Sequence, residues 1–131
     1  MSILTSNIML FQGLESDMEM DLMSPPVQRA TEYIKENYDR PISVMEVAEH
    51  VALSYHHLCR KFRKETGLTV IELISQLRIE KAKNLLTSTP HPVNEVARQV
   101  GFTSTVQFHR TFRKQTNDTP MQFRKKAFGE G

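Results

Sequence analysis

The 131-residue sequence has one cysteine, no tryptophan and no long uninterrupted run of apolar residues. A single cysteine excludes an internal disulfide framework and a cysteine-rich zinc module. A transmembrane helix needs about 20 mostly apolar residues in a row, and no such segment is present. The first residues contain neither a basic stretch nor a small-residue cleavage site, so the sequence indicates no secretory signal. We therefore expect a cytoplasmic location and no membrane partner.

Motifs of catalysis and metal binding are also missing. The sequence has no glycine-rich phosphate loop, no Ser-His-Asp arrangement and no cluster of paired carboxylates, so we expect neither an enzyme nor a cofactor. Cys59 could share a helical face with His56, but zinc prefers four converging ligands and no second cysteine is available, so we predict no metal site. A redox-sensing role for Cys59, which is followed by Arg60 and Lys61, stays open as a minor alternative.

Charged residues are distributed unevenly along the chain. Residues 1–23 carry four acidic groups and no basic one, whereas the other 108 residues carry all 17 basic groups against 11 acidic ones. We interpret residues 1–23 as a flexible linker or tail, with the apolar stretch 8–11 as an alternative docking segment. Basic clusters attract polyanions in a salt-dependent way, although most charge runs are only solvated faces. The clusters lie within Arg60–Lys64, Arg110–Lys114 and Arg124–Lys126.

Apolar residues recur at helical spacing from residue 24 onward, and no useful length of chain alternates with a period of two. The pattern predicts an all-α body over residues 24–128 with about seven helices. Ser24, followed by proline, is expected to cap the first helix, and the capping-box patterns Ser43–Glu46 and Thr69–Glu72 open two others. The residues expected on inner helix faces include Val44, Leu58, Phe62, Leu77, Phe108 and Phe112.

The chain also contains an internal repeat. Glu46-Val47-Ala48 recurs as Glu95-Val96-Ala97 at an offset of 49, and residues 58–66 match residues 108–116 at an offset of 50. Each copy has the pattern of a short helix, a tight turn and a longer helix with basic groups, which is typical of a helix-turn-helix unit. A plain duplicated α-hairpin would repeat its core residues equally well.

We predict the two helix-turn-helix units at about 43–66 and 92–116, joined by a connecting helix at about 69–87. A helix of this length is about 28 Å long, whereas successive major grooves on one face of B-DNA lie about 34 Å apart. Two recognition helices at its ends could therefore enter adjacent grooves, with a bend of the DNA making up a slight shortfall.

Side chains on the outward helix faces distinguish a DNA-binding repeat from a duplicated hairpin that only packs. Leu58 and Phe62 share one face, and Arg60 points about 200° away from it. Arg110 holds the equivalent position in the second copy, and arginine there can read guanine through a bidentate contact. A helical module whose basic faces bind an acidic protein partner is the alternative. Phosphate or helix-terminus contacts are expected from Ser54, Tyr55, Arg63, Lys64, Ser104, His109, Arg113 and Lys114.

The most specific stretches read Gly101-Phe102-Thr103-Ser104, then Phe108-x-Arg110-x-Phe112-Arg113-Lys114, then Thr119-Pro120 with Phe123-Arg124. They are similar to the G-F-S-S, F-x-R-x-F-K-K and T-P-x-x-Y/F-R signature of the AraC/XylS family of bacterial transcription regulators. Residues 24–128 as a whole resemble the DNA-binding domain of this family.

The resemblance implies two helix-turn-helix subdomains with which one monomer reads an asymmetric site in double-stranded promoter DNA. It also implies an activator that touches RNA polymerase, and a sensory or dimerisation domain outside this chain. The matching positions imply that bases are read by His56, Cys59 and Arg60 in one groove, and by Thr105, Val106, Gln107 and Arg110 in the next.

Several positions depart from the usual family pattern. Ala52 stands where the first turn often has glycine, which predicts a turn without a positive φ. Asn117 replaces a frequent glycine, but asparagine tolerates the left-handed region, so the helix end is expected to form. Gln107 replaces a frequent aromatic residue, and Cys59 and Val106 are unusual base readers.

Overall fold

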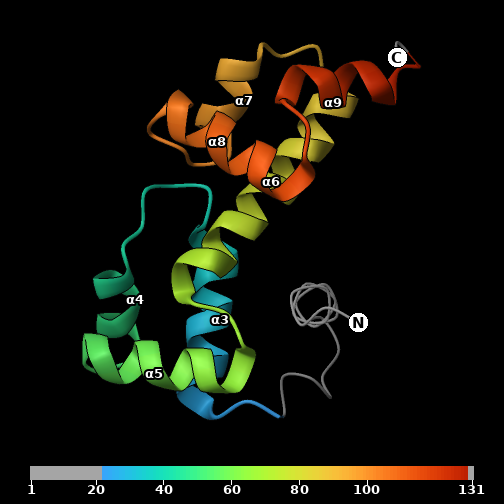
Figure 1. The fold of residues 1–131 in the computed structure, drawn as a ribbon. Coiled ribbons are helices and arrows are strands. Elements are labelled where there is room, and N and C mark those ends of the chain that lie inside the picture. Colours follow the sequence, from blue (N-terminus) through green and yellow to red (C-terminus); the bar gives the residue numbers. More distant parts are fainter. Residues whose placement is uncertain (1–21, 130–131) are drawn as a thin grey trace. The chain divides into compact units, whose positions relative to one another are not determined.

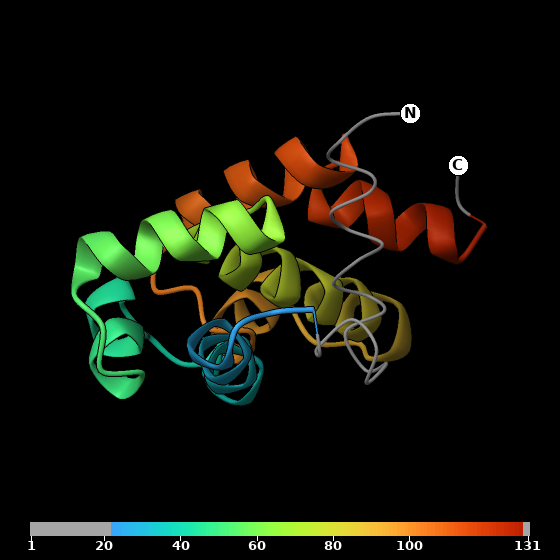
Figure 2. The ribbon, with the colours of Figure 1, turned by 90° about the horizontal axis from the view of Figure 1, so that it is seen from below.

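The computed structural model describes residues 22–129, and every regular element in that range is a helix (Figures 1 and 2). This confirms the predicted all-α fold. No described helix has both the length and the apolar character that a membrane crossing requires. The helices are α3 (Pro25–Asn37), α4 (Val44–His50), α5 (Tyr55–Thr66), α6 (Val70–Ser88), α7 (Val93–Gln99), α8 (Thr105–Thr116) and α9 (Pro120–Ala127).

The chain divides into two compact units. In the described range, the first unit comprises residues 22–35 and 43–73, and the second comprises residues 36–42 and 74–129. The first therefore holds most of α3, all of α4 and α5, and the start of α6. The second holds the rest of α6 together with α7, α8 and α9. Each unit contains one of the two repeats.

The core of the first unit forms where α3, α4 and α5 bury their apolar faces. Leu58 and Phe62 of α5 are fully buried, as the periodicity predicts. Val44 is only half-buried, although its spacing placed it on the inner face of α4. The other fully buried apolar side chains of this unit are Val27, Ala30, Ile34, Val47, Ala48, Leu68 and Leu73.

Ser24 connects the start of α3 to the end of α5. Its N–H donates to Glu65 Oε1 at 2.7 Å and its hydroxyl donates to Oε2 at 2.9 Å. The Ser24 side chain was expected to cap α3, and it is directed to α5 instead. Burial alone would raise the pKa of Glu65, but the hydrogen bonds from Ser24 and the ion pair with Lys61 outweigh it and lower that pKa. Met23, the last residue of the expected tail, is buried.

The second unit has an aromatic core. The ring centroids of Phe102 and Phe108 lie 5.3 Å apart, those of Phe108 and Phe112 5.7 Å, and those of Phe112 and Phe123 5.5 Å. Leu77 of α6, expected inside, is half-buried. The remaining buried members of this cluster are Ile79, Ala82, Leu86, Val96, Ala97 and Val100.

Arginine side chains hold the loops of the second unit through backbone carbonyls. Arg78 Nε donates to the Tyr38 carbonyl at 2.7 Å, which fixes segment 36–42. Arg124 was grouped with the polyanion-binding clusters, yet its guanidinium donates to the carbonyls of Leu86 and His91 at 2.9 and 2.6 Å. Because these carbonyls lie at and beyond the end of α6, Arg124 acts as a C-terminal cap of that helix.

The two helix-turn-helix turns share one backbone geometry. In the first, the N–H of Leu53 donates to the Ala48 carbonyl and Ala52 has φ +60°. In the second, the N–H of Phe102 donates to the Ala97 carbonyl and Gly101 has φ +108°. Both are Schellman ends, which need a residue of positive φ just after the helix. The expectation that alanine marks a turn without positive φ is therefore wrong, because hydrogen bonding of the turn outweighs the strain on Ala52.

Candidate nucleic-acid interface

Helices α5 and α8 are built in the same way from matching residues. The hydroxyl of Ser54 accepts from the N–H of His57 at 3.1 Å, and that of Ser104 accepts from the N–H of Gln107 at 3.2 Å. These bonds satisfy amide groups that a helix start leaves without partners. At the other end, the left-handed residues are Gly67, with φ +79°, and Asn117, with φ +66°. The expectation for Asn117 is confirmed.

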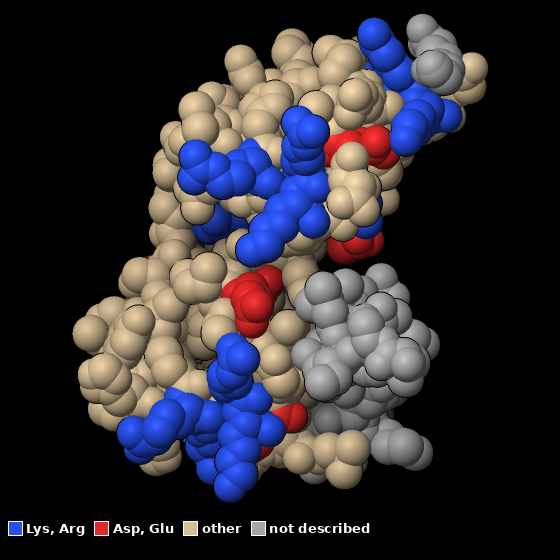
Figure 3. Space-filling view, viewed as in Figure 1, with Lys and Arg blue, Asp and Glu red and all other residues tan. Residues whose placement is uncertain are grey.

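The outward faces of both helices are basic and exposed. Lys and Arg side chains gather over α5 and over α8 in the space-filling view (Figure 3). Lys61 belongs to the first sequence cluster but pairs with Glu65 at 3.3 Å, as the Lys–Glu spacing of four residues allows. On α5 and α8, the exposed cations that have no ion pair with any described acidic residue are Arg60, Arg63, Lys64, Arg110, Arg113 and Lys114.

A purely structural role explains only some of these cations. Arg63 and Lys64 lie in the last turn of α5, where positive charge stabilises the helix dipole by about 0.3–1 kcal/mol. The last turn of α8 carries the equivalent pair. Arg60 and Arg110 each lie in the middle of a twelve-residue helix, beyond the range of that effect. Stabilisation of the helix ends therefore does not explain their matching outward positions.

The other residues of the α5 and α8 regions that were predicted to contact DNA are exposed, with one exception. The ring of Tyr55 packs edge-on against that of His56, with centroids 5.4 Å apart. In α8, the ring of His109 lies edge-on to Phe108 at 5.7 Å. The exposed predicted residues of these regions are Ser54, Tyr55, His56, Ser104, Thr105, Val106, Gln107 and His109.

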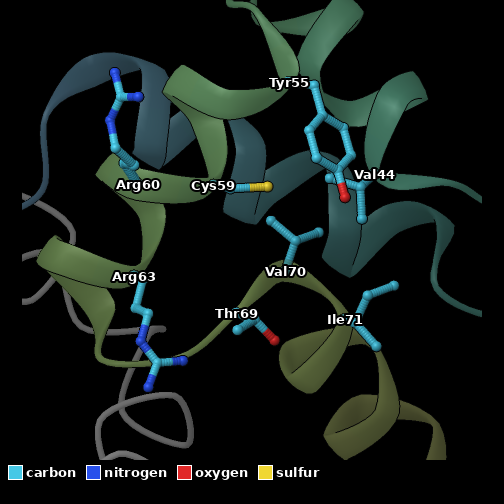
Figure 4. Close-up of a pocket in the computed structure, with 8 residues that line it drawn as sticks. All are labelled: Val44, Tyr55, Cys59, Arg60, Arg63, Thr69, Val70 and Ile71. Carbon is cyan, nitrogen blue, oxygen red and sulfur yellow. The ribbon is translucent and has the colours of Figure 1, made fainter.

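The exception is Cys59, which is half-buried. Its sulfur faces a recess of about 440 Å³, which Arg60 also lines (Figure 4). Apolar side chains from α4 and α6, among them Val44, Val70 and Ile71, line the recess. The arrangement places Cys59 at the edge of the outward face rather than at its centre. No group of three His, Cys, Asp or Glu side chains in residues 22–129 is arranged to hold a metal ion.

Known proteins are similar to this chain in sequence and in architecture. Residues 47–126 match the family of helix-turn-helix domains. An uncharacterized HTH-type transcriptional regulator of Staphylococcus aureus is 36% identical over 98 residues, which cover 75% of this chain and 13% of that protein. The arabinose operon regulatory protein of Escherichia coli is 37% identical over 103 residues, which cover 78% of this chain and 35% of that protein. The chain thus spans about an eighth to a third of the length of these relatives.

Solved structures agree with these matches. The C-terminal domain of AraT, a response regulator from Geobacillus stearothermophilus, has a TM-score of 0.77 at 34% identity and covers 79% of this chain and 87% of its own. The DNA-binding domain of AdpA, solved in complex with a target DNA, has a TM-score of 0.74 at 26% identity and covers 82% of this chain and 100% of its own. These are transcription factors or regulators, which agrees with the prediction that the chain is not an enzyme. The chain belongs to the AraC-type helix-turn-helix family of DNA-binding transcription regulators.

Proposed function

We propose that this chain activates transcription by reading a promoter with both units, placing α5 and α8 in adjacent major grooves. The observation that carries the proposal is the repeated, exposed arginine. Arg60 and Arg110 occupy the same position in helices of equal length, and neither forms an ion pair with a described acidic residue. A guanidinium at the centre of a helix in the major groove can make the bidentate contact that identifies guanine.

Other outward side chains divide between reading and positioning. Arg63, Lys64, Arg113 and Lys114 lie toward the helix ends and suit phosphates, which fix the register of the protein on DNA. Ser54, Tyr55, Ser104 and His109 are proposed to contact phosphates or to hold the helix termini. Bases are proposed to be read by His56, Cys59, Arg60, Thr105, Val106, Gln107 and Arg110.

The length of α6 supports the use of two neighbouring grooves. The helix has 19 residues, which corresponds to about 28 Å. Successive grooves on one side of the duplex lie about 34 Å apart, so a bend of the DNA toward the protein would complete the fit. The bend would carry a sequence-dependent cost, which adds specificity at bases that no side chain touches.

Resemblance to the family supports the remaining parts of the proposal. We include RNA polymerase as a partner, the bacterial cytoplasm as the location, and a sensory or dimerisation domain that works with this module. The match covers only 13% and 35% of the two curated relatives, which leaves room for such a domain in those proteins. The solved complex of AdpA with a target DNA supports the choice of double-stranded DNA as the ligand.

Selection of duplexes from a random pool, followed by a salt titration, tests the proposal. The four cations assigned to phosphates predict a slope of log K against log salt of about −3.6. Arg60→Ala and Arg110→Ala should each reduce discrimination at one base pair by about 1–3 kcal/mol. Arg29→Ala, which removes an exposed charge from α3, is the matched control and should keep full discrimination.

Equal affinity for selected and random duplexes at every salt concentration would overturn the proposal. That result would leave the basic faces as a docking surface for an acidic protein, the alternative function. Activation is tested separately by transcription in vitro from a promoter that carries the selected site.

A further inference from the structure

We infer that Val106 reads the methyl group of a thymine in the half-site bound by α8. This inference rests on the proposed function and assigns a base to one of its residues. Val106 is 64% exposed, and it is the exposed large apolar side chain of α8, because Phe108 and Phe112 are fully buried. Single exposed apolar residues are common and need no explanation by themselves. The position of Val106 in α8 is what supports a role in base reading.

Val106 lies in the first turn of α8, one residue after Thr105 and one turn before Arg110. The N-terminal residues of a recognition helix are those that contact base edges. The backbone there is fixed, because Ser104 caps the helix by accepting from the N–H of Gln107 at 3.2 Å. The valine side chain is therefore presented to a base edge from a rigid helix end.

The chemistry of valine leaves one base as its match. The side chain has no hydrogen-bond donor or acceptor, so it cannot select among the polar groups of the major groove. The C5 methyl of thymine is the apolar group that the four base pairs offer there. Contact between the two removes apolar surface of both from water, which favours thymine over cytosine at that position.

Spacing along the helix locates this thymine relative to the guanine read by Arg110. Side chains four residues apart are separated by about 5–6 Å. Base pairs follow one another every 3.4 Å along each strand, so the two contacted bases lie within about two base pairs of each other. The equivalent residue in the first repeat is His56, which carries polar ring nitrogens. The methyl contact therefore belongs to one half-site only and makes the whole site asymmetric.

Replacement of single thymines by deoxyuridine tests the inference, since it deletes the methyl group and leaves the pairing edge intact. The full 131-residue chain is titrated with its selected duplex and with duplexes that carry one deoxyuridine each. We expect one position, within two base pairs of the guanine at which Arg110→Ala relaxes specificity, where the substitution weakens binding about fourfold. In Val106→Ala this position should lose its sensitivity. In the control Arg29→Ala, which alters an exposed residue outside the proposed interface, the fourfold effect should remain.

The outcomes separate this inference from the proposed function. A pool that yields no preferred sequence overturns both. A preferred sequence in which no deoxyuridine matters, or in which the sensitive position remains equally sensitive in Val106→Ala, overturns the assignment of Val106 alone. Val106 is exposed, so Val106→Ala should unfold like the native chain, and circular dichroism verifies this.

Discussion

Gly101 and Ala52 occupy the same place in the two helix-turn-helix turns, and exchanging the residue types should have opposite effects. A Cβ on Gly101 would lie 2.7 Å from the Tyr38 carbonyl oxygen and 2.9 Å from Arg78 Nε. Its φ of +108° also lies outside the region that alanine tolerates. Backbone strain of about 1–3 kcal/mol and overpacking of about 1–3 kcal/mol together predict that Gly101→Ala lowers the free energy of unfolding by about 2–6 kcal/mol.

Ala52→Gly is the matched substitution in the first turn. Ala52 has φ +60° and its side chain is exposed, so glycine relieves left-handed strain of about 1–2 kcal/mol without loss of packing. The greater freedom of glycine in the unfolded chain offsets about 0.4–1 kcal/mol of that gain. We expect Ala52→Gly to leave the free energy of unfolding unchanged or to raise it by up to about 1.6 kcal/mol.

Thermal and urea unfolding, followed by circular dichroism, measure both variants. In a domain of about 100 residues, 1 kcal/mol shifts Tm by about 4–8 °C, so Gly101→Ala should lower Tm by about 8 °C or more. A Tm within about 2 °C of the native value, at an unchanged urea slope, would show that the turn does not approach the Tyr38 carbonyl so closely. A large loss in Ala52→Gly would refute the argument from left-handed strain.

Three further substitutions test the core, a carboxylate and a cap. Phe112→Ala should lower the free energy of unfolding by about 3–5 kcal/mol through a core cavity, and a small change in Tm would contradict the aromatic core. Glu65 has a lowered pKa in the folded state, so the native chain should have a higher free energy of unfolding than Glu65→Gln above about pH 4.3. This difference should vanish as the pH falls through the lowered folded pKa, and a difference that grows in acid would contradict the sign. Arg124→Ala should cost about 1.5–3 kcal/mol in urea unfolding while DNA affinity stays constant, whereas a loss of affinity alone would make Arg124 a phosphate contact.

Local patterns were sufficient to predict most of the fold. The Thr69 and Glu72 pair forms its capping box, with reciprocal bonds of 3.0 and 2.8 Å, because both partners lie within one turn of helix. Phe62 and Phe112 are buried because a period of 3.6 residues places them on one face with their neighbours. Such features depend on residues close in sequence, and a sequence shows them directly.

Contacts between distant residues were the ones that sequence reasoning missed. Arg124 looks like part of a basic run, but its acceptors are backbone carbonyls 33–38 residues away. Ser24 is a residue type that commonly caps helices, yet its hydroxyl donates a hydrogen bond to a carboxylate 41 residues away. Every residue has a backbone carbonyl, so no residue pattern could have predicted the contacts of Arg124.

Under the proposed function, the repeat gives one scaffold two different half-sites to read. Core and turn positions fix the same geometry in both copies: Leu58 corresponds to Phe108, and Phe62 corresponds to Phe112. The outward positions are free of that constraint, because their side chains touch little of the protein. Both copies have arginine at one of these positions. At another, histidine in the first copy corresponds to valine in the second. Under the proposed function, a duplication with these properties retains the charge that attracts DNA while its two helices acquire separate base preferences, so asymmetry of the binding site follows from divergence of exposed residues alone.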